Sequence, residues 1–318
     1  MRGDVVVVGG GVIGLTTALT LAERGARVRV WTRDGAGETT SATAGALWWP
    51  YRIEPGEQAG AWALESLRVY GGLARDAART GVRMVAGVHA GVRLDGLGPW
   101  AREVAGLRGT APGELPGAYA AGVAARLPLI DMPVHLAWLR GRLEAAGGAV
   151  ESRTVASFGE AAAEADVVVN CTGLAARELV PDDGMRAVRG QLVWVENPGV
   201  EEWFTAADAG SSATTYFFPQ PGRLVLGGTA EEGDERTEPD GATAAAIVER
   251  CARIRPEIAD ARVLAHRVGL RPARVGGVRL AAGRPAGGDA LLVHNYGHGG
   301  AGVTVAWGCA RAAAGLVP

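Results

Sequence analysis

The chain opens with a hydrophobic pattern that is typical of a nucleotide-binding fold. Val5 to Val8 form a continuous β-branched run, which indicates a strand buried on both faces. Apolar residues then recur at helical spacing from Leu15 to Glu23, and Gly25 stands where a helix commonly ends. Residues 26–32 alternate as a second strand. The pattern therefore predicts a strand, a glycine-rich turn, a helix and a strand within about 30 residues.

Further along the chain, the pattern predicts that this unit is interrupted twice. Residues 55–125 read as helices and irregular segments, and Pro128 to Ala146 read as a helix. Residues 150–155 and 165–171 look like strands of the first unit. Between Arg189 and Gly228 the alternation instead indicates antiparallel strands, with a helix following over 243–253 and a strand and helix closing the chain.

We therefore expect an α/β protein built from two interleaved domains. A Rossmann-like cofactor-binding domain with a parallel sheet would comprise residues 1–48, 126–178 and 264–318. An α+β substrate-binding domain on a mainly antiparallel sheet would comprise residues 49–125 and 179–263.

Composition narrows the possible functions. The 318 residues are 48% hydrophobic with a net charge of −2, which does not favour nucleic-acid binding as the main task. All 32 basic residues are arginine, which excludes mechanisms that need a lysine Schiff base or a phosphate-loop lysine. Cys171, Cys251 and Cys309 are widely spaced and odd in number, so we expect reduced, buried thiols and no metal site. No signal segment precedes the first strand and no apolar run is long enough for a membrane span, so we expect a cytoplasmic protein.

Gly9, Gly11 and Gly14 form a G-x-G-x-x-G motif in the strand and helix context that gives it meaning. The first glycine permits the turn, the second admits a pyrophosphate and the third lets helix and strand pack. The motif predicts a bound dinucleotide. The acidic residue expected after the second strand arrives late, at Asp34 beside Arg33, so this spacing leaves the identity of the dinucleotide open.

Two further turns favour FAD. The core strand at 167–169 ends in Asn170-Cys171-Thr172-Gly173, a small polar turn that lets backbone approach a ligand. Residues 294–304, His-Asn-Tyr-Gly-His-Gly-Gly-Ala-Gly-Val-Thr, form a second glycine turn at the start of a helix. A helix N-terminus stabilises the negative charge that a flavin gains on reduction, and a nicotinamide gains no comparable charge.

Tyr216 and Arg271 are candidate substrate-binding residues. Arg271 lies in Gly-Leu-Arg-Pro, where an arginine among apolar residues needs an anionic partner. A guanidinium matches a carboxylate with two parallel hydrogen bonds, and a tyrosine hydroxyl adds another. A structural ion pair is the alternative for Arg271, and a half-buried strand aromatic is the alternative for Tyr216.

These features together resemble the D-amino-acid oxidase family of FAD-dependent oxidases. The resemblance extends from Val5 to about Ala313 and rests on the order and spacing of several motifs. They are VVVVGGGVIGLTTA, AGALWWPY, ADVVVNCTG, RGQL, YFFP, LGG, GLRPAR and HNYGHGGAGVT.

The resemblance implies an activity and a set of site residues. Arg271 and Tyr216 would hold the α-carboxylate of a D-amino acid, and the carbonyl of Gly300 would meet its amino group. A hydride would pass from the α carbon to flavin N5, O2 would be reduced to hydrogen peroxide, and the imino acid would yield a 2-oxo acid and ammonia. Trp49, Tyr51 and Ser212 would line the substrate pocket. The residues implied at FAD are Gly9, Gly11, Val12, Ile13, Gly14, Arg33, Asp34, Thr39, Thr40, Ser41, Gly45, Ala46, Leu47, Val155, Thr172, Gly173, Gly297, Gly299, Gly300, Gly302, Val303 and Thr304.

Two departures from the family pattern bear on the substrate. Ser212 replaces a second tyrosine found in many members on a mobile lid, and Trp49 replaces an amide residue. The segment 205–215 holds Asp208 and no arginine, so we expect neutral D-amino acids to be preferred over acidic ones.

Several other functions compete with this interpretation. A glycine or secondary-amine oxidase and a D-aspartate oxidase are alternatives within the family, although the sarcosine branch relies on a lysine that this chain lacks. A nicotinamide-dependent dehydrogenase and a non-catalytic flavin sensor are alternatives outside it. The resemblance also implies a homodimer, which is the common state in the family.

Overall fold

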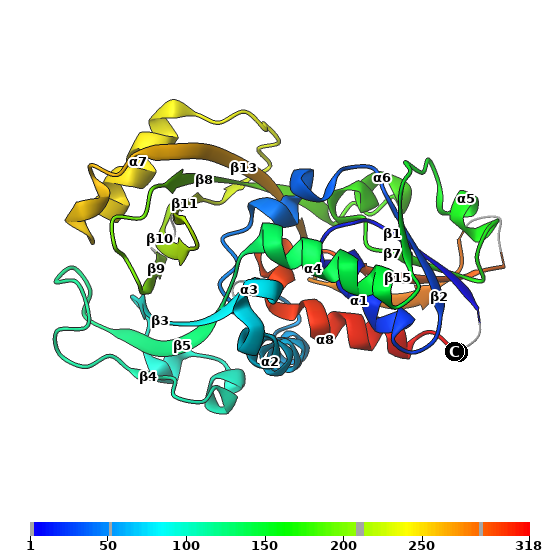
Figure 1. Ribbon diagram of the computed structural model, residues 1–318, viewed down its shortest axis with the longest axis horizontal. Helices are drawn as coiled ribbons and strands as arrows, with labels where there is room; N and C mark the ends of the chain where they lie inside the picture. The colour runs from blue at the N-terminus through cyan, green and yellow to red at the C-terminus, as the bar shows by residue number, and fades with distance from the viewer. Residues whose placement is uncertain (1–2, 51–52, 208–212, 286–288) are drawn as a thin grey trace.

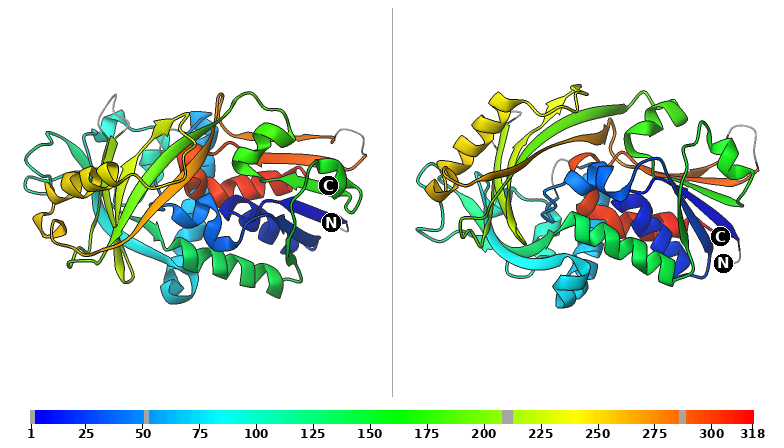
Figure 2. Two further views of the ribbon diagram at one scale, coloured as in Figure 1. Left: turned by 90° about the horizontal axis from the view of Figure 1, so that it is seen from above. Right: turned by 45° about the horizontal axis from the view of Figure 1, so that its top comes forward.

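The computed structural model describes residues 3–50, 53–207, 213–285 and 289–318. Two sheets lie side by side along the long axis of the molecule (Figure 1). Two further views show α7 (yellow) over the larger sheet, at the end of the molecule away from α1 (blue) and α8 (red) (Figure 2). The chain therefore forms two sheet-based parts, as the interrupted pattern predicts.

The smaller sheet carries the predicted nucleotide-binding unit. Its strand order is β14-β15-β7-β1-β2-β6, and its pairings are parallel except that of the edge strand β14. The β-branched runs of β1 and β7 are buried, which explains why their positions can be predicted from hydrophobicity. The strands are β1 (Asp4–Val8), β2 (Arg27–Thr32), β6 (Ala149–Ser152), β7 (Val167–Asn170), β14 (Arg279–Gly283) and β15 (Leu291–Tyr296).

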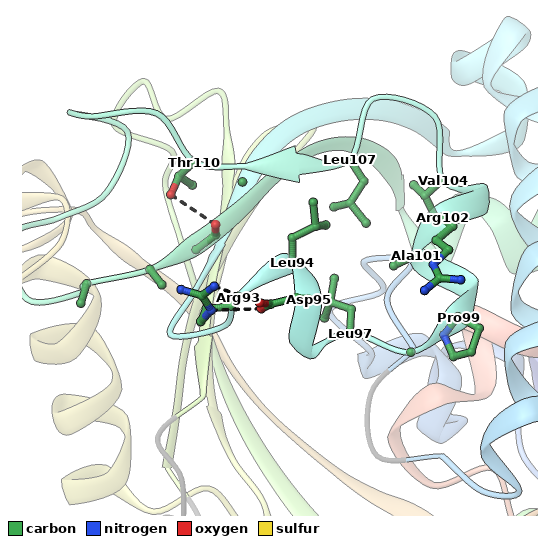
Figure 3. Close-up of a pocket in the computed structure, with 15 residues that line it drawn as sticks. Arg93, Leu94, Asp95, Leu97, Pro99, Ala101, Arg102, Val104, Leu107 and Thr110 are labelled. Atoms are coloured by element: carbon green, nitrogen blue, oxygen red, sulfur yellow. Dashed lines mark hydrogen bonds and ion pairs between the residues drawn. The ribbon is translucent and has the colours of Figure 1, made fainter.

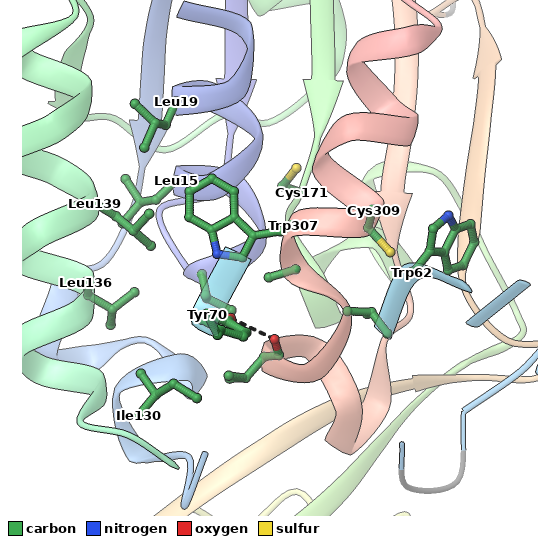
Figure 4. Close-up of a cluster of buried hydrophobic side chains, with 14 of the residues drawn as sticks. Leu15, Leu19, Trp62, Tyr70, Ile130, Leu136, Leu139, Cys171, Trp307 and Cys309 are labelled. Carbon is green, nitrogen blue, oxygen red and sulfur yellow. Dashed lines mark hydrogen bonds between the residues drawn. The ribbon is translucent and has the colours of Figure 1, made fainter. Parts of the chain in front are cut away.

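Three longer helices contact strands of this sheet, and a fourth packs on one of them. They are α1 (Val12–Ala22), α2 (Gly56–Leu73), α4 (Met132–Ala145) and α8 (Gly302–Gly315). Helix α8 packs against both α1 and α2, and Tyr70 of α2 donates a 2.8 Å hydrogen bond to the carbonyl of Val303 inside this core (Figure 4). A Cβ at Gly308 would lie 2.4 Å from the Trp62 backbone, so this glycine lets α2 and α8 approach closely.

The larger sheet is mainly antiparallel. Its order is β12-β8-β11-β10-β9-β3-β5-β4, and β13 also pairs with β8. Helix α7 (Gly241–Ala252) covers one face, where Ile247 and Cys251 share a core with Phe217 and Leu226. The strands are β3 (Val82–Ala90), β4 (Arg108–Gly109), β5 (Gly122–Ile130), β8 (Met185–Val195), β9 (Trp203–Ala207), β10 (Ala213–Gln220), β11 (Arg223–Thr229), β12 (Glu231–Glu232) and β13 (Val263–Arg274).

Short helical segments connect these elements. The α-helical ones are α3 (Ala77–Thr80), α5 (Phe158–Ala162) and α6 (Ala176–Leu179). The 3-10 turns are η1 (Ala36–Glu38), η2 (Thr40–Thr43), η3 (Ala74–Asp76), η4 (Leu94–Gly96), η5 (Pro99–Glu103), η6 (Gly173–Ala175), η7 (Pro256–Ile258) and η8 (Gly299–Ala301).

Two sequence expectations about these elements are wrong. Residues 82–90 form strand β3, whereas the pattern indicated helices and irregular structure over 55–125. Pro128 lies inside strand β5, and the following helix begins only at Met132. Asp131 and the proline at the second helical position mark the true start of α4, because proline is tolerated in a first turn.

The division into two domains stays a prediction. Strand β5 crosses the expected boundary between residues 125 and 126, and β13 crosses the one between 263 and 264. Both belong to the larger sheet. A division that follows the sheets would therefore keep each of these strands in one domain.

Candidate active site

The turn after β1 requires glycine at two positions of the predicted motif. A Cβ at Gly14 would lie 1.8 Å from the carbonyl oxygen of Gly9, and one at Gly9 would lie 2.3 Å from the carbonyl oxygen of Cys171. Gly9 also adopts a φ of 119°, which L side chains rarely adopt. The backbone of this turn is therefore closely packed between β1 and the turn after β7.

The N-terminus of α1 follows this turn, and two predicted residues, Ser41 and Thr172, lie beside it or beside the turn. The hydroxyl of Ser41 accepts a 3.0 Å hydrogen bond from the amide of Val12. Thr172 donates through both its amide and its hydroxyl to Asn170 Oδ1, at 3.1 and 2.8 Å, which fixes the turn after β7. A helix N-terminus beside a strand end is a ready anion site, since its first amides lack intrahelical acceptors.

The end of β2 leads to a cavity of about 200 Å³. Asp34 lines it, and Arg33 donates two hydrogen bonds to the Asp34 carboxylate, at 2.8 and 2.9 Å. These hydrogen bonds, with the positive charge of Arg33, hold the pKa of Asp34 below its usual value. The other residues around the cavity are Gly10, Leu15, Thr32, Gly35, Ala36, Arg140, Val150 and Ser152.

Val155, predicted at the cofactor, is buried in a small core with Val8 and Trp31. Its side chain therefore belongs to this core, and a contact with the cofactor would have to come from its backbone. Arg140 is a cavity residue that the sequence analysis missed, because its α4 position carries no motif.

The segment of predicted cofactor residues from Thr39 to Leu47 lies between the start of α1 and the larger sheet. Thr40 donates a 3.2 Å hydrogen bond to the carbonyl of Leu270 in β13, while Thr39 donates to Ala36 within its own turn. Ala46 has a φ of 60° and its carbonyl accepts from Ile130 of β5, and Leu47 bridges to Leu129. A Cβ at Gly45 would lie 2.8 Å from the Phe218 ring, so this glycine lets the segment reach β10.

The C-terminal glycine turn lies between β15 and α8, beside the end of β13. Gly297 and Gly299 have φ values of 87° and 54°, and His298 forms a bridge with Ala273. Gly300 lies in η8, and Gly302, Val303 and Thr304 begin α8. Thr304 Oγ1 donates to the carbonyl of Trp49 at 3.0 Å and accepts from its amide at 3.3 Å. The start of α8 is thus tied to the segment that carries Trp49.

The two histidines of this turn brace it. His298 Nε2 lies 3.1 Å from Asn295 Oδ1, and His294 Nδ1 lies 3.3 Å from Asn170 Nδ2. Burial lowers the pKa of His298 to about 3 and that of His294 to about 4, so both rings are neutral at pH 7.

Tyr216 and Arg271, which are far apart in the sequence, converge over one short segment of β11. A Cβ at Gly228 would lie 2.9 Å from the Tyr216 hydroxyl, and one at Gly227 would lie 1.9 Å from the Tyr216 ring. Arg271 Nη1 donates a 2.9 Å hydrogen bond to the carbonyl of the next residue, Thr229. The phenol and the guanidinium therefore lie beside consecutive residues of one strand.

A third glycine leaves room for the guanidinium itself. A Cβ at Gly190 of β8 would lie 2.3–2.5 Å from the guanidinium atoms of Arg271. Gly190 pairs with Gly269 of β13, two residues before Arg271. Thr229 and Gly190 were missed by the sequence analysis, although Gly190 lies within the RGQL motif. Tyr51 and Ser212, the other predicted pocket residues, lie outside the described residues.

A cavity of about 790 Å³ lies elsewhere, at the end of β3 and β5 (Figure 3). Its lining includes the exposed pair Arg93–Asp95 and the side chains of Leu97, Val104 and Leu107. Predicted site residues do not line it. We therefore place the candidate active site at Tyr216, Arg271 and the glycine turns, and not in this larger opening.

A buried network around the carboxylate of Asp182 holds together the segments that lead into the C-terminal glycine turn. Asp182 accepts from Tyr296 at 2.6 Å and from Arg274 at 2.9 Å, and Arg279 donates to the Tyr296 hydroxyl at 2.8 Å. Burial alone would raise the pKa of Asp182, but these hydrogen bonds and the charge of Arg274 outweigh it and lower the pKa to about 2. The network therefore joins the end of β15, at Tyr296, to the end of β13, at Arg274.

Asp182→Asn is expected to lower the free energy of unfolding by about 2 kcal/mol at pH 7, because the shifted pKa reports that stabilisation. A carboxylate whose pKa is depressed by folding stabilises the protein fully above its pKa in the unfolded chain, about 3.9. This stabilisation is lost as the pH falls towards the folded-state pKa of about 2. Thermal unfolding midpoints of both proteins from pH 7 to pH 3 check this. The difference between the two unfolding midpoints should be constant above pH 5 and shrink below pH 4. A gap that stays constant down to pH 3 would contradict the assignment.

The described cysteines fit their predicted state. Cys171, Cys251 and Cys309 are buried free thiols, and burial raises the pKa of both Cys171 and Cys251 to about 12. Among the helices that the structure describes, none combines the length and apolar character needed to cross a bilayer.

Comparison with known proteins identifies the family. A sequence profile described as FAD dependent oxidoreductase matches residues 4–316. The chain belongs to this family. It is 64% identical over 315 residues to a protein of Streptomyces coelicolor named D-amino-acid oxidase, covering 99% of this chain and 96% of the relative. A protein of the same name from Rubrobacter xylanophilus is 49% identical over 321 residues, covering 99% and 97%.

A solved structure shares the fold. The glycine oxidase from Geobacillus kaustophilus superposes with a TM-score of 0.83 at 22% identity, covering 99% of this chain and 94% of that one. The mixed architecture of one parallel and one mainly antiparallel sheet is thus confirmed as the family's fold.

The site fits FAD, the cofactor of this family. Gly9 and Gly14 leave no room for side chains, so the turn packs tightly around Gly11, the position at which the motif lets backbone approach a pyrophosphate. The cavity at Asp34 adjoins the same turn through Gly10, and the start of α8 presents a second helix N-terminus after a turn that pairs with Ala273, two residues beyond Arg271. Two amide-rich ends and an intervening threonine-rich segment suit one long cofactor with a charged centre.

Proposed function

We propose that this protein oxidatively deaminates neutral D-amino acids. A D-amino acid, O2 and water would give the 2-oxo acid, ammonia and hydrogen peroxide. The shared family and the two close relatives named above support the substrate class. The family's use of FAD also argues against the nicotinamide-dependent alternative.

One observation carries the assignment of the substrate site. The hydroxyl of Tyr216 and the guanidinium of Arg271 lie beside consecutive residues, Gly228 and Thr229. One guanidinium N–H is held by Thr229, which orients the group so that its remaining donors would bind the two oxygens of an α-carboxylate. Tyr216 would donate a further hydrogen bond to the same carboxylate.

The amino group would be held from the opposite side. Gly300 follows the bridge between His298 and Ala273, two residues beyond Arg271, so its carbonyl would accept from the substrate's amine. When bound, FAD supplies the acceptor for the α-carbon hydride and the place where O2 is reduced. The chain's part is then to fix the substrate between these contacts, because a well-oriented reactant lowers the barrier.

The residues proposed at FAD divide between its two ends. The turn from Gly9 to Gly14, with Val12 and Ile13, would bind the pyrophosphate, and Arg33 and Asp34 would face the nucleoside end. Gly302, Val303 and Thr304 would hold the flavin end, where the positive end of α8 would stabilise the charge gained on reduction. Two aromatic rings that contact Trp49 are uncharged, which supports a neutral substrate. They are Trp100 and His89, whose pKa burial lowers to about 4.

An anaerobic titration of the purified holoprotein tests the activity. D-Alanine should bleach the flavin absorption bands, and L-alanine should leave them unchanged. In air, a panel of D-valine, D-phenylalanine, D-aspartate and glycine should show the neutral D-amino acids with the higher kcat/KM, measured as hydrogen peroxide formed. The highest kcat/KM on D-aspartate or glycine would overturn the proposed substrate class, and no bleaching by any of them would indicate a sensor.

A further inference from the structure

Three residues form a continuous row across the larger sheet. His89 of β3 pairs in register with Thr205 of β9, and Thr205 pairs with Tyr216 of β10. Register partners place their side chains on the same face of a sheet. The neighbouring row, Val88, Phe204 and Phe217, packs into the core under α7 on the other face. His89 and Thr205 therefore face the same side as Tyr216, towards the candidate active site.

Trp49 joins this row to the flavin end of the site. Its backbone is held by both hydrogen bonds to Thr304 at the start of α8. Its ring lies 4.9 Å from the His89 ring, tilted by 47°, and 5.2 Å from the Trp100 ring, nearly perpendicular at 87°. The indole is thus fixed between two rings, one from the sheet and one from η5. Aromatic pairs at such distances and angles attract each other beyond their burial.

His89 is itself held in one orientation. Its Nδ1 lies 2.6 Å from Thr205 Oγ1, which sets the plane of the imidazole that Trp49 contacts. Burial keeps the ring neutral at pH 7, so it offers Trp49 an uncharged face. Thr205 therefore acts on the indole through this ring.

We propose that His89 and Thr205 set the selectivity for the substrate's side chain by fixing the tilt of Trp49. The inference rests on the proposed D-amino-acid oxidase function and adds positioning residues that do not touch the α-carboxylate or the amine. The fixed indole limits the size of side chain that the site accepts. Removal of the imidazole opens space behind the indole, and Trp49 then turns away from the substrate.

The experiment compares kcat/KM for D-phenylalanine with kcat/KM for D-alanine in the holoenzyme. His89→Ala and Thr205→Val should each raise this ratio, with a tenfold rise expected for His89→Ala, which is the scale of a hydrophobic pocket contact of about one methylene group. Trp49→Ala should raise the ratio at least as much. His89→Ala should add nothing in the Trp49→Ala background, because it acts through that indole. His266→Ala, an exposed histidine on β13, is the control and should leave the ratio unchanged.

The outcomes separate this inference from the activity it rests on. A wild-type protein inert towards every D-amino acid would overturn both. An active wild type whose ratio is unchanged in His89→Ala and Thr205→Val would overturn only the positioning role. Additive effects of His89→Ala and Trp49→Ala would do the same, since they would show independent action. If His89→Ala loses flavin, Thr205→Val decides the matter, because it keeps the size and β-branching of the side chain.

Discussion

Arg271→Ala is expected to lower kcat/KM for D-alanine by about 10²–10³-fold while the protein keeps its flavin. The variant removes the cationic partner of the α-carboxylate, and loss of one member of such a hydrogen-bonded charge pair costs about 2–5 kcal/mol. The interaction forms with the bound substrate, so most of the loss should appear as a higher KM. Steady-state kinetics and the flavin absorption spectrum of the same preparation measure both parts of the prediction.

Two further variants distinguish a carboxylate-binding role from a structural one. Arg271→Lys keeps the charge but loses the planar fork, so it should recover only part of the activity. Gly190→Ala keeps Arg271 but places a Cβ 2.3–2.5 Å from its guanidinium atoms, which must move. The flexible end of the arginine can shift without unfolding the sheet, so kcat/KM should fall while the thermal midpoint changes little. Unchanged kinetics in Arg271→Ala would instead make the arginine a structural partner of Thr229.

The part of the fold that could be predicted from sequence is the part where each element is buried in a simple way. Strands β1 and β7 lie inside a parallel sheet, and their runs of valine record burial on both faces. The turn at Gly9 and Gly14 was predictable because steric limits on the backbone leave glycine as the residue that fits. Tyr216 and Arg271 were candidates from their residue types and local sequence, but their shared role at one carboxylate came from the family resemblance, since sequence spacing does not reveal that they meet at β11.

The elements that the sequence does not predict are those whose conformation is set by pairing with distant strands and not by the local hydrophobic pattern. In β3 the apolar residues Val82, Val85 and Val88 are three apart, which mimics helical spacing. The strand is instead fixed by its pairing with β5 and β9. Because β3 could not be predicted, the row of His89 and Thr205 beside Tyr216 could not be predicted either. Register between distant strands is a tertiary property that hydrophobic periodicity does not encode.

Gly14→Ala is expected to abolish FAD binding, and it is the change with the largest predicted effect at the cofactor. The new Cβ would lie 1.8 Å from the carbonyl oxygen of Gly9, and neither backbone segment can yield without opening the turn. The turn holds α1 against β1. The loss of stability should therefore far exceed the usual effect of a helical Gly→Ala change. The ratio of absorbance at the flavin band to that at the protein band measures the bound cofactor.

Gly141→Ala is the matched control, because Gly141 also lies inside a long helix, α4, and has open space around its Cβ position. There the substitution should stabilise the protein by about 0.5–1 kcal/mol, as alanine is the better helix former. Circular dichroism of Gly14→Ala then separates loss of cofactor from loss of fold. Full flavin content in Gly14→Ala would mean that α1 can withdraw from β1, and the pyrophosphate would then have to be placed elsewhere than at this turn.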